Sequence, residues 1–155
     1  MKAIKTFTLI FLLALISVTS FGQMESLDIS EFDKNSVYGN VGIGGLYFTA
    51  TAYYERLIFK PFEKNNISPI LKIGYGGYAD WNGQGDYLLA QAGIITGINK
   101  HHFESSAGLV YYPKDQTAFP SILVGYRKQK PNSPFLFRTG IGFPEAIYAG
   151  IGWTF

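Results

Sequence analysis

Apolar and polar residues alternate with a period of two along most of the chain, and the last ten residues show the pattern most clearly. In the stretch 146–155, one set of alternate positions is apolar: Ile147, Ala149, Ile151, Trp153 and Phe155. The positions between them hold small or polar residues: Tyr148, Gly150, Gly152 and Thr154. Successive side chains of a β-strand point to opposite faces, so this stretch is predicted to be a strand with one apolar face.

Turn signals divide the chain from residue 37 onward into eight segments of this kind. We predict strands over residues 37–43, 46–59, 69–79, 87–98, 101–112, 119–128, 135–143 and 146–155. The longest connection is predicted at residues 60–68, and a Gly-rich turn at residues 80–86. No helical periodicity is present. The predicted fold is therefore all-β, an eight-stranded antiparallel up-and-down barrel over residues 37–155.

The two rows of alternate positions differ in size as well as in polarity. One row collects bulky apolar residues, among them Phe48, Ile73, Leu109 and Phe137, whereas the other is rich in Gly, Ser and Thr. An eight-stranded barrel has an interior just wide enough for side chains to fill, so the small residues fit inside more easily. We therefore predict a transmembrane barrel whose apolar row faces lipid; a soluble barrel with the opposite arrangement is the alternative.

Charged residues occur on the row predicted to face inward: Glu55, Lys72, Glu104, Arg127 and Arg138. An unpaired charge in a narrow lumen of low dielectric constant is costly. We therefore predict a lumen charge network in which the two carboxylates pair with the three cations. Such a network would satisfy the polar interior of the barrel, and a path for ions would require it to rearrange.

Aromatic residues gather near the predicted strand ends, as they do at both water interfaces of membrane barrels. We predict four interface aromatics: Trp81, Tyr87, Tyr111 and Trp153. Their positions indicate an apolar wall bounded by an aromatic girdle at each end.

The final stretch also resembles a known class of proteins. Its alternating hydrophobic residues, Ile151, Trp153 and Phe155, resemble the C-terminal strand by which the barrel-assembly machinery recognises bacterial outer-membrane proteins. The chain resembles small eight-stranded barrels of the OmpA/OmpX-like class, and its stretches 20–23 and 54–56 resemble uncharacterised outer-membrane proteins of Gram-negative Bacteroidota. The resemblance implies an outer-membrane location and a monomer without enzymatic activity. It implies as partners outer-membrane lipid, the barrel-assembly machinery and periplasmic chaperones.

The turns predicted at one end of the barrel are short. With both termini in the periplasm, residues 44–45, 80–86, 113–118 and 144–145 would connect strands on the outer side of the cell. Connections of this length offer no large surface for recognising a partner. The longer connection at residues 60–68 would then be periplasmic.

The N-terminal residues predict export. Two lysines precede an apolar run over residues 7–18, and Ser20 and Gly22 are small residues suited to cleavage after Gly22. This pattern is typical of a secretory signal peptide, predicted at residues 1–22, and the run is too short to span a membrane as a helix. A polar leader without strand alternation is predicted at residues 23–36.

Removal of the signal peptide changes the charge of the chain. The full sequence has 13 Lys and Arg against 11 Asp and Glu, and two of the lysines leave with the signal peptide (13 − 2 = 11). The remaining chain is formally neutral, which gives no reason to expect a nucleic-acid partner. Cys is absent, so we expect neither disulfides nor a Cys-linked lipid anchor.

Two patterns resemble catalytic or metal sites only in part. His102, Glu104 and Ser106 share one predicted face, but His102 and Ser106 would lie about 13 Å apart along a strand, beyond the reach of a catalytic triad. The turn at residues 80–86 alternates oxygen ligands as a calcium loop does, but its twelfth position is Gln91 rather than Glu. We therefore predict no enzyme, no metal and no cofactor. The alternatives are a lipid-modifying outer-membrane enzyme, a narrow channel and a secreted soluble lipid-binding barrel.

Overall fold

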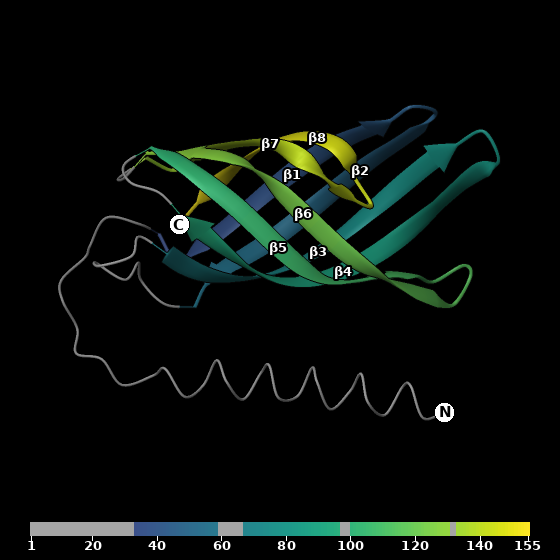
Figure 1. Cartoon of the computed structure of the whole chain (residues 1–155), viewed down its shortest axis with the longest axis horizontal. Helices are drawn as coiled ribbons and strands as arrows, with labels where there is room; N and C mark the ends of the chain where they lie inside the picture. The colour runs from purple at the N-terminus through teal and green to yellow at the C-terminus, as the bar shows by residue number, and fades with distance from the viewer. Residues whose placement is uncertain (1–32, 59–66, 97–99, 131–132) are drawn as a thin grey trace, which may run out of the picture. The chain divides into compact units, whose positions relative to one another are not determined.

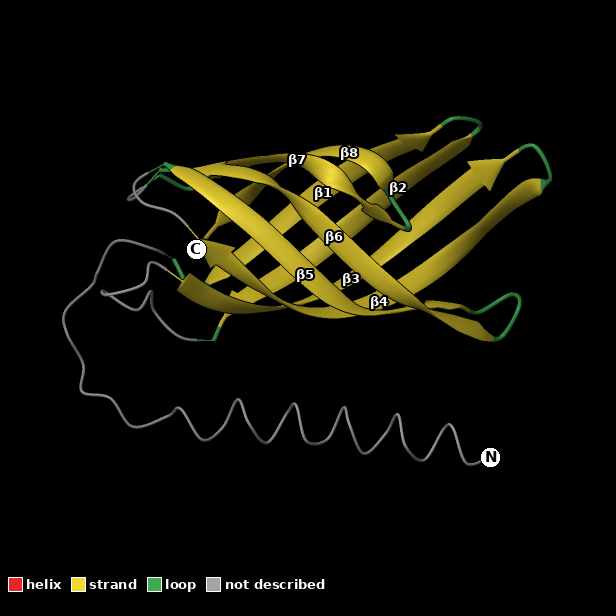
Figure 2. Cartoon of the chain, in the orientation of Figure 1, coloured by secondary structure: helices red, strands yellow, loops and turns green. Residues whose placement is uncertain are grey.

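The computed structural model of the chain describes residues 33–58, 67–96, 100–130 and 133–155, and within them the structure is all-β (Figure 2). Its strands are β1 (Asn35–Gly44), β2 (Tyr47–Leu57), β3 (Ile67–Asp80), β4 (Gly83–Thr96), β5 (His101–Tyr112), β6 (Thr117–Gln129), β7 (Phe135–Phe143) and β8 (Ala146–Thr154). These residues contain no helix long and apolar enough to cross a membrane.

Each strand pairs with the next in antiparallel fashion, and β1 also pairs with β8, so the sheet closes on itself (Figure 1). The closing register begins with Ser36 opposite Thr154. Just past β8, Phe155 and Asn35 exchange two backbone hydrogen bonds, with N···O distances of 3.0 and 2.9 Å. The predicted eight-stranded antiparallel up-and-down barrel is confirmed.

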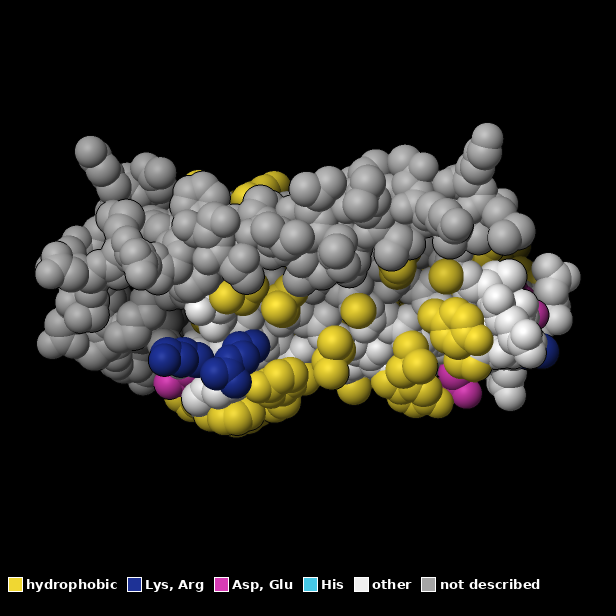
Figure 3. Space-filling view, turned by 90° about the horizontal axis from the view of Figure 1, so that it is seen from below, with side chains coloured by type: hydrophobic (Ala, Val, Ile, Leu, Met, Phe, Trp, Pro, Cys, Tyr) yellow, Lys and Arg dark blue, Asp and Glu magenta, His cyan; other side chains and the backbone are white. Residues whose placement is uncertain are grey.

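Side chains alternate between the outside and the inside of this wall. Large apolar residues on every strand face outward and are well exposed, for example Val41 at 66 %, Ile73 at 60 %, Ile141 at 62 % and Ile151 at 57 %. Figure 3 shows such hydrophobic side chains spread along the length of the visible face. The positions between them point inward and are mostly buried, including all five predicted lumen charges. The outer surface is therefore apolar, and the interior carries ionic groups.

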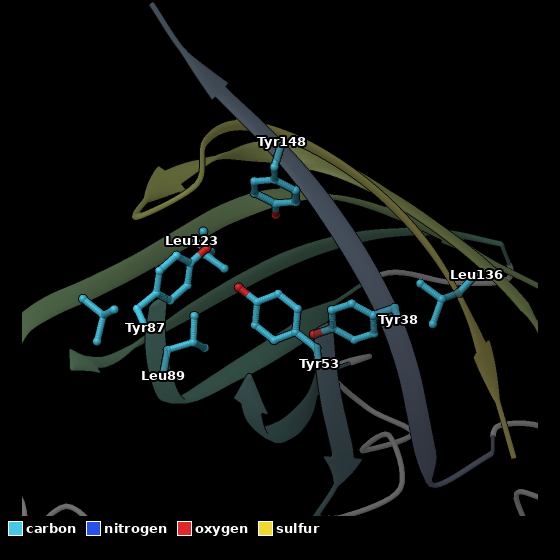
Figure 4. Packing of buried hydrophobic residues seen from close by; sticks show 8 residues of the cluster. Tyr38, Tyr53, Tyr87, Leu89, Leu123, Leu136 and Tyr148 are labelled. Carbon is cyan, nitrogen blue, oxygen red and sulfur yellow. The ribbon is translucent and has the colours of Figure 1, made fainter. Parts of the chain in front are cut away.

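The interior also holds large side chains besides the small residues of the predicted inward row, on which Tyr148 was already placed. A buried cluster of tyrosines and aliphatic residues occupies the lumen (Figure 4): Tyr38, Tyr53, Tyr87, Leu89, Val110, Leu123, Leu136 and Tyr148. The inward row is therefore rich in Gly, Ser and Thr as predicted but also carries bulky residues that were not predicted to lie inside, such as Tyr87 and Leu123. Glycines provide the space for the rings, because a Cβ on Gly74 would lie 2.9 Å from the Tyr53 ring and one on Gly76 would lie 2.7 Å from the Tyr87 ring.

The N-terminal boundary of the barrel is corrected by the structure. β1 begins at Asn35, so the last two residues of the predicted leader belong to the barrel. They are recruited because their backbones pair with β2 and β8. The predicted signal peptide at residues 1–22, most of the leader and most of the connection at residues 60–68 lie outside the described residues.

The Gly-rich turn predicted at residues 80–86 is also shorter than expected. Pairing between β3 and β4 continues to Asp80 opposite Gly83, so only Trp81 and Asn82 form the turn. The Asp80 carboxylate accepts a hydrogen bond from the Asn82 backbone N at 2.8 Å. Glycine lowers strand propensity but keeps both backbone hydrogen-bonding groups, which is why the ladder extends through this stretch.

The hairpins at one end of the barrel differ in how far they extend beyond the rest of the wall. This end, here called the hairpin end, holds the turns between β1 and β2, β3 and β4, β5 and β6, and β7 and β8, and the C-terminus lies at the opposite, terminal end (Figure 1). β6 pairs with β5 as far as Thr117 opposite Tyr112, but with β7 only as far as Ile122 opposite Phe143. The wall is therefore notched beyond the β7–β8 hairpin. Phe119, which shares the inward face of its partner Val110, is 48 % exposed there.

Candidate functional site

The charged residues of the lumen form the candidate site. The lumen charge network consists of Glu55 on β2, Lys72 on β3, Glu104 on β5, Arg127 on β6 and Arg138 on β7. All five side chains point inward and are at most 2 % exposed. The structure brings them together in one connected set of ion pairs across the interior.

Arg127 connects Glu55 with the rest of the network. Its Nη1 donates a hydrogen bond to Glu55 Oε1 and lies 3.9 Å from Glu104 Oε2. Its Nε donates to Gln129 Oε1 at 2.9 Å, and its Nη2 donates to a serine hydroxyl on β1 at 3.2 Å. The second oxygen of Glu55 accepts a hydrogen bond from the Tyr38 hydroxyl at 3.1 Å. These bonds offset the cost of removing both ions from water.

Glu104 is the common counter-ion of the three cations. Lys72 Nζ lies 3.0 Å from Glu104 Oε1, and Arg138 Nη2 donates to the same oxygen. Within the described residues the other oxygen, Oε2, accepts no hydrogen bond and lies 3.9 Å from Arg127 Nη1. Loss of this one carboxylate would therefore affect every cation of the network.

Tyrosine rings complete the surroundings of Arg138. Its guanidinium carbon lies 4.3 Å from the centroid of the Tyr38 ring, 5.2 Å from that of Tyr148 and 5.7 Å from that of Tyr53. Figure 4 shows these three rings pointing into the lumen. Arg138 Nε and Nη1 have no hydrogen-bond partner among the residues that the structure describes. The negative faces of the rings therefore supply part of the compensation for this buried charge.

A further charged residue of the lumen was missed by the sequence analysis. Glu145 belongs to the turn between β7 and β8, which was predicted to lie at the surface, but its side chain is fully buried. Its Oε2 accepts a hydrogen bond from Asn40 Nδ2 at 2.8 Å, and its Oε1 accepts one from the Tyr53 hydroxyl at 2.9 Å. The turn can fold inward because β1 has a glycine at position 42. A Cβ on Gly42 would lie only 2.1 Å from the Glu145 carbonyl oxygen.

Glu145 brings the formal charge of the interior to zero. The predicted network holds three cations and two carboxylates, which leaves 3 − 2 = +1, and Glu145 supplies the missing negative charge. Among the described residues, these six are the buried side chains with a formal charge. A neutral interior is expected, because a net charge in a medium of low dielectric constant is poorly solvated.

This arrangement is suited to cross-linking the barrel from within. The largest fully buried side chains include Arg127, Arg138, Tyr87 and Tyr148, which project into the lumen from four different strands. They occupy the cross-section that a permeating solute would need. A conducting path would therefore require buried ion pairs to break.

The residues that share the inward face of β5 are engaged with other partners. His102, Glu104 and Ser106 are all buried. Ser106 Oγ donates to Gln91 Oε1 at 3.2 Å, and His102 Nε2 lies 3.2 Å from the backbone oxygen of Gln129. The Glu104 carboxylate is paired with Lys72 and Arg138. The described residues also contain no group of three or more His, Cys, Asp or Glu side chains able to hold a metal ion.

The predicted interface aromatics are divided between the outside and the inside. Trp81, Tyr111 and Trp153 face outward and are 77 %, 41 % and 56 % exposed. The prediction for Tyr87 was wrong: its side chain is fully buried, and its hydroxyl is hydrogen-bonded to Thr51 Oγ1. β4 begins four residues earlier than expected, so Tyr87 lies inside the strand, on its inward row, rather than at its end.

The predicted assembly signal lies on the outer wall. Ile151, Trp153 and Phe155 form one outward row at the end of the chain and are each more than half exposed. The Trp153 ring packs edge to face against Phe135 of β7, with centroids 6.1 Å apart. The row is therefore accessible to a partner from outside the barrel.

The chain matches no protein-family model, no curated protein and no solved structure. Its function is therefore inferred from the wall, the lumen and the hairpin end of the barrel.

Proposed function

We propose that the protein is a small integral outer-membrane β-barrel with a structural role in the cell envelope, a lumen filled by side chains and no catalytic activity. One observation carries the proposal: large apolar side chains are exposed on every strand, around an interior that holds ion pairs. In water such a wall would promote aggregation. In a bilayer it would face hydrocarbon, and the closed sheet leaves no backbone edge without a partner.

The lengths of the strands support this placement. The shortest, β7 and β8, have 9 residues each, and the longest, β3 and β4, have 14. A tilted strand needs about 9 to 11 residues to cross the hydrocarbon core. Every strand is therefore long enough to span a bilayer.

Charges are concentrated beyond the apolar wall at the terminal end. Exposed basic residues there are Lys34, Arg56, Lys100, Lys128 and Lys130. Figure 3 shows Lys and Arg side chains gathered toward that end of the visible face. A polar rim next to an apolar belt is typical of a barrel that crosses a membrane.

The proposed partners follow from the same placement. Outer-membrane lipid would cover the wall, and the row of Ile151, Trp153 and Phe155 would be available to the barrel-assembly machinery after delivery by periplasmic chaperones. The protein would be exported with the predicted signal peptide. A closed barrel offers no free strand edge for pairing with another copy, which supports a monomer.

The interior supports a structural role over the alternatives. A narrow channel would need the ion pairs around Glu104 and Arg127 to open, and a lipid-modifying enzyme would need a nucleophile or base free to meet substrate. A secreted lipid-binding barrel would place its bulky apolar row inside. Here that row faces outward, and the lumen is occupied by rings and ions.

Cell fractionation combined with gel migration of heated and unheated samples tests the proposal. We expect the protein in the outer membrane, with the unheated barrel migrating differently from the heat-unfolded chain. Recovery from the soluble periplasm or the medium would contradict the membrane placement. Discrete conductance steps in planar bilayers would favour the channel, and an altered lipid A acyl pattern in a deletion strain would favour the enzyme.

A further inference from the structure

A cleft opens at the hairpin end of the barrel, where the short β7–β8 hairpin leaves the wall notched. This mouth cleft has a volume of about 500 Å³. Aromatic rings line it on several strands: Phe143 on β7, and a row of four, Tyr47, Tyr78, Tyr112 and Phe119. A cavity of this size is within the range that holds a small organic ligand. The cleft is part of the barrel whether lipid or water surrounds the wall.

The four rings form a continuous row from β2 to β6. Tyr47 stacks on Tyr78 with centroids 6.0 Å apart, and Tyr78 meets Tyr112 edge to face at 5.6 Å. Tyr112 in turn meets Phe119 edge to face at 6.0 Å. The rings occupy inward positions, but the three tyrosines are only partly buried and Phe119 is exposed, because the β7–β8 hairpin stops short of them. The row therefore presents accessible aromatic surface to the cleft.

The charges around the cleft are predominantly negative. Of the described residues that line it, Asp115 alone is charged. The exposed charged residues at the hairpin end, among those the structure describes, are Asp80, Asp86, Asp115 and Lys114, which gives 1 − 3 = −2. Glu145 lies between two lining residues in the sequence, but its own carboxylate is buried in the lumen on Asn40 and Tyr53 and does not line the cleft. Among the described residues, the exposed charges of the terminal end are in contrast mostly basic.

We propose that the mouth cleft binds a small organic cation that carries an alkylammonium group. The faces of aromatic rings attract such cations, most strongly when water is partly excluded. The Asp115 carboxylate also attracts a cation, and the described lining contains no Lys or Arg that would repel one. An anion would meet the net negative charge of this end, so anionic ligands are disfavoured.

The test compares two ligands of the same shape. Choline and 3,3-dimethylbutan-1-ol differ in whether the branched centre is a charged nitrogen or a neutral carbon. Binding to the purified full barrel is measured by calorimetry in dodecyl maltoside, which carries no ammonium group of its own. We expect choline to bind and the neutral alcohol to bind at least several-fold more weakly. Equal binding of the two, or no binding of choline at millimolar concentration, would overturn the proposal.

Paired variants locate the site. Phe119→Leu removes a lining ring and is compared with Phe48→Leu, which removes an exposed ring outside the cleft. Asp115→Asn is compared with Asp80→Asn at the neighbouring turn. We expect about 2- to 5-fold weaker choline binding for each cleft variant and unchanged binding for its control. Equal effects within a pair would refute the assignment. Since the readout is binding by the folded barrel, it is independent of where in the cell the protein resides.

Discussion

Replacing Glu104 with Gln should destabilise the barrel more than any other isosteric change of a single charge. The amide keeps the shape of the side chain but removes the counter-ion shared by Lys72 and Arg138, both of which contact the same carboxylate oxygen. The formal charge of the interior changes from zero to +1. Breaking a buried ion pair by removing one partner costs about 3 to 5 kcal/mol. The equilibrium constant for folding should therefore fall by more than about 100-fold.

Urea unfolding of the barrel in phospholipid vesicles provides the measurement. Trp81 and Trp153 lie on the outer surface and report the transition by fluorescence. The control is Asp80→Asn, an equivalent change at an exposed turn, for which we expect a shift within about 0.5 kcal/mol. If Glu104→Gln and Asp80→Asn unfold at the same urea concentration, the reasoning on the buried network is refuted.

A second substitution separates charge balance from loss of a hydrogen bond. The double variant Glu104→Gln, Lys72→Met returns the formal charge of the interior to zero. It should be more stable than the sum of the two single effects predicts, by at least about 1 kcal/mol, because the two residues are in direct contact. Strict additivity would indicate that the carboxylate acts only on Arg138 and Arg127.

Three other predictions follow from the wall and the hairpin end. Gly42→Val should cost about 1 to 3 kcal/mol in the same unfolding assay, because its Cβ would overlap the Glu145 carbonyl oxygen; an unchanged midpoint would contradict the close approach. Ile73→Lys, in the middle of β3, should cost about 2 to 4 kcal/mol in vesicles if this face meets hydrocarbon, and a neutral effect there would argue against the membrane placement. Deleting Phe155 should reduce the amount of heat-modifiable barrel recovered from cells. Normal recovery would show that assembly does not require Phe155.

The sequence predicted the strands well because alternation persists through almost every segment. A single apolar row such as Ile147, Ala149 and Ile151 fixes which face points outward, and the same parity placed Glu104 and Arg138 inside. Pairing in a barrel then brings inward charges within reach of one another even when they are far apart in the chain. The ion-pair partners were therefore accessible to reasoning from pattern and charge alone.

The two misplaced residues, Tyr87 and Glu145, lie beside turns. There the turn residues suggested a strand end or an exposed position, and the alternation of the strand was not followed. Tyr87 follows a Gly-rich stretch and was treated as a strand end. Its neighbour Leu88 belongs to the outward row, so the alternation already indicated that Tyr87 points inward. Glu145 follows a proline in a two-residue turn, where a polar residue is ordinarily exposed. Its burial depends on Gly42 of β1, a relationship that is visible only once the closing register is known.

The final hairpin brings its own countercharge into the barrel. β2 to β6 contribute Glu55, Lys72, Glu104 and Arg127, whose formal charges cancel, and the β7–β8 hairpin contributes Arg138 together with Glu145. An unclosed sheet of the first six strands and the incoming hairpin are thus each electrically balanced. Each part is therefore formally neutral by itself, so the sheet can close without burying a net charge on either side.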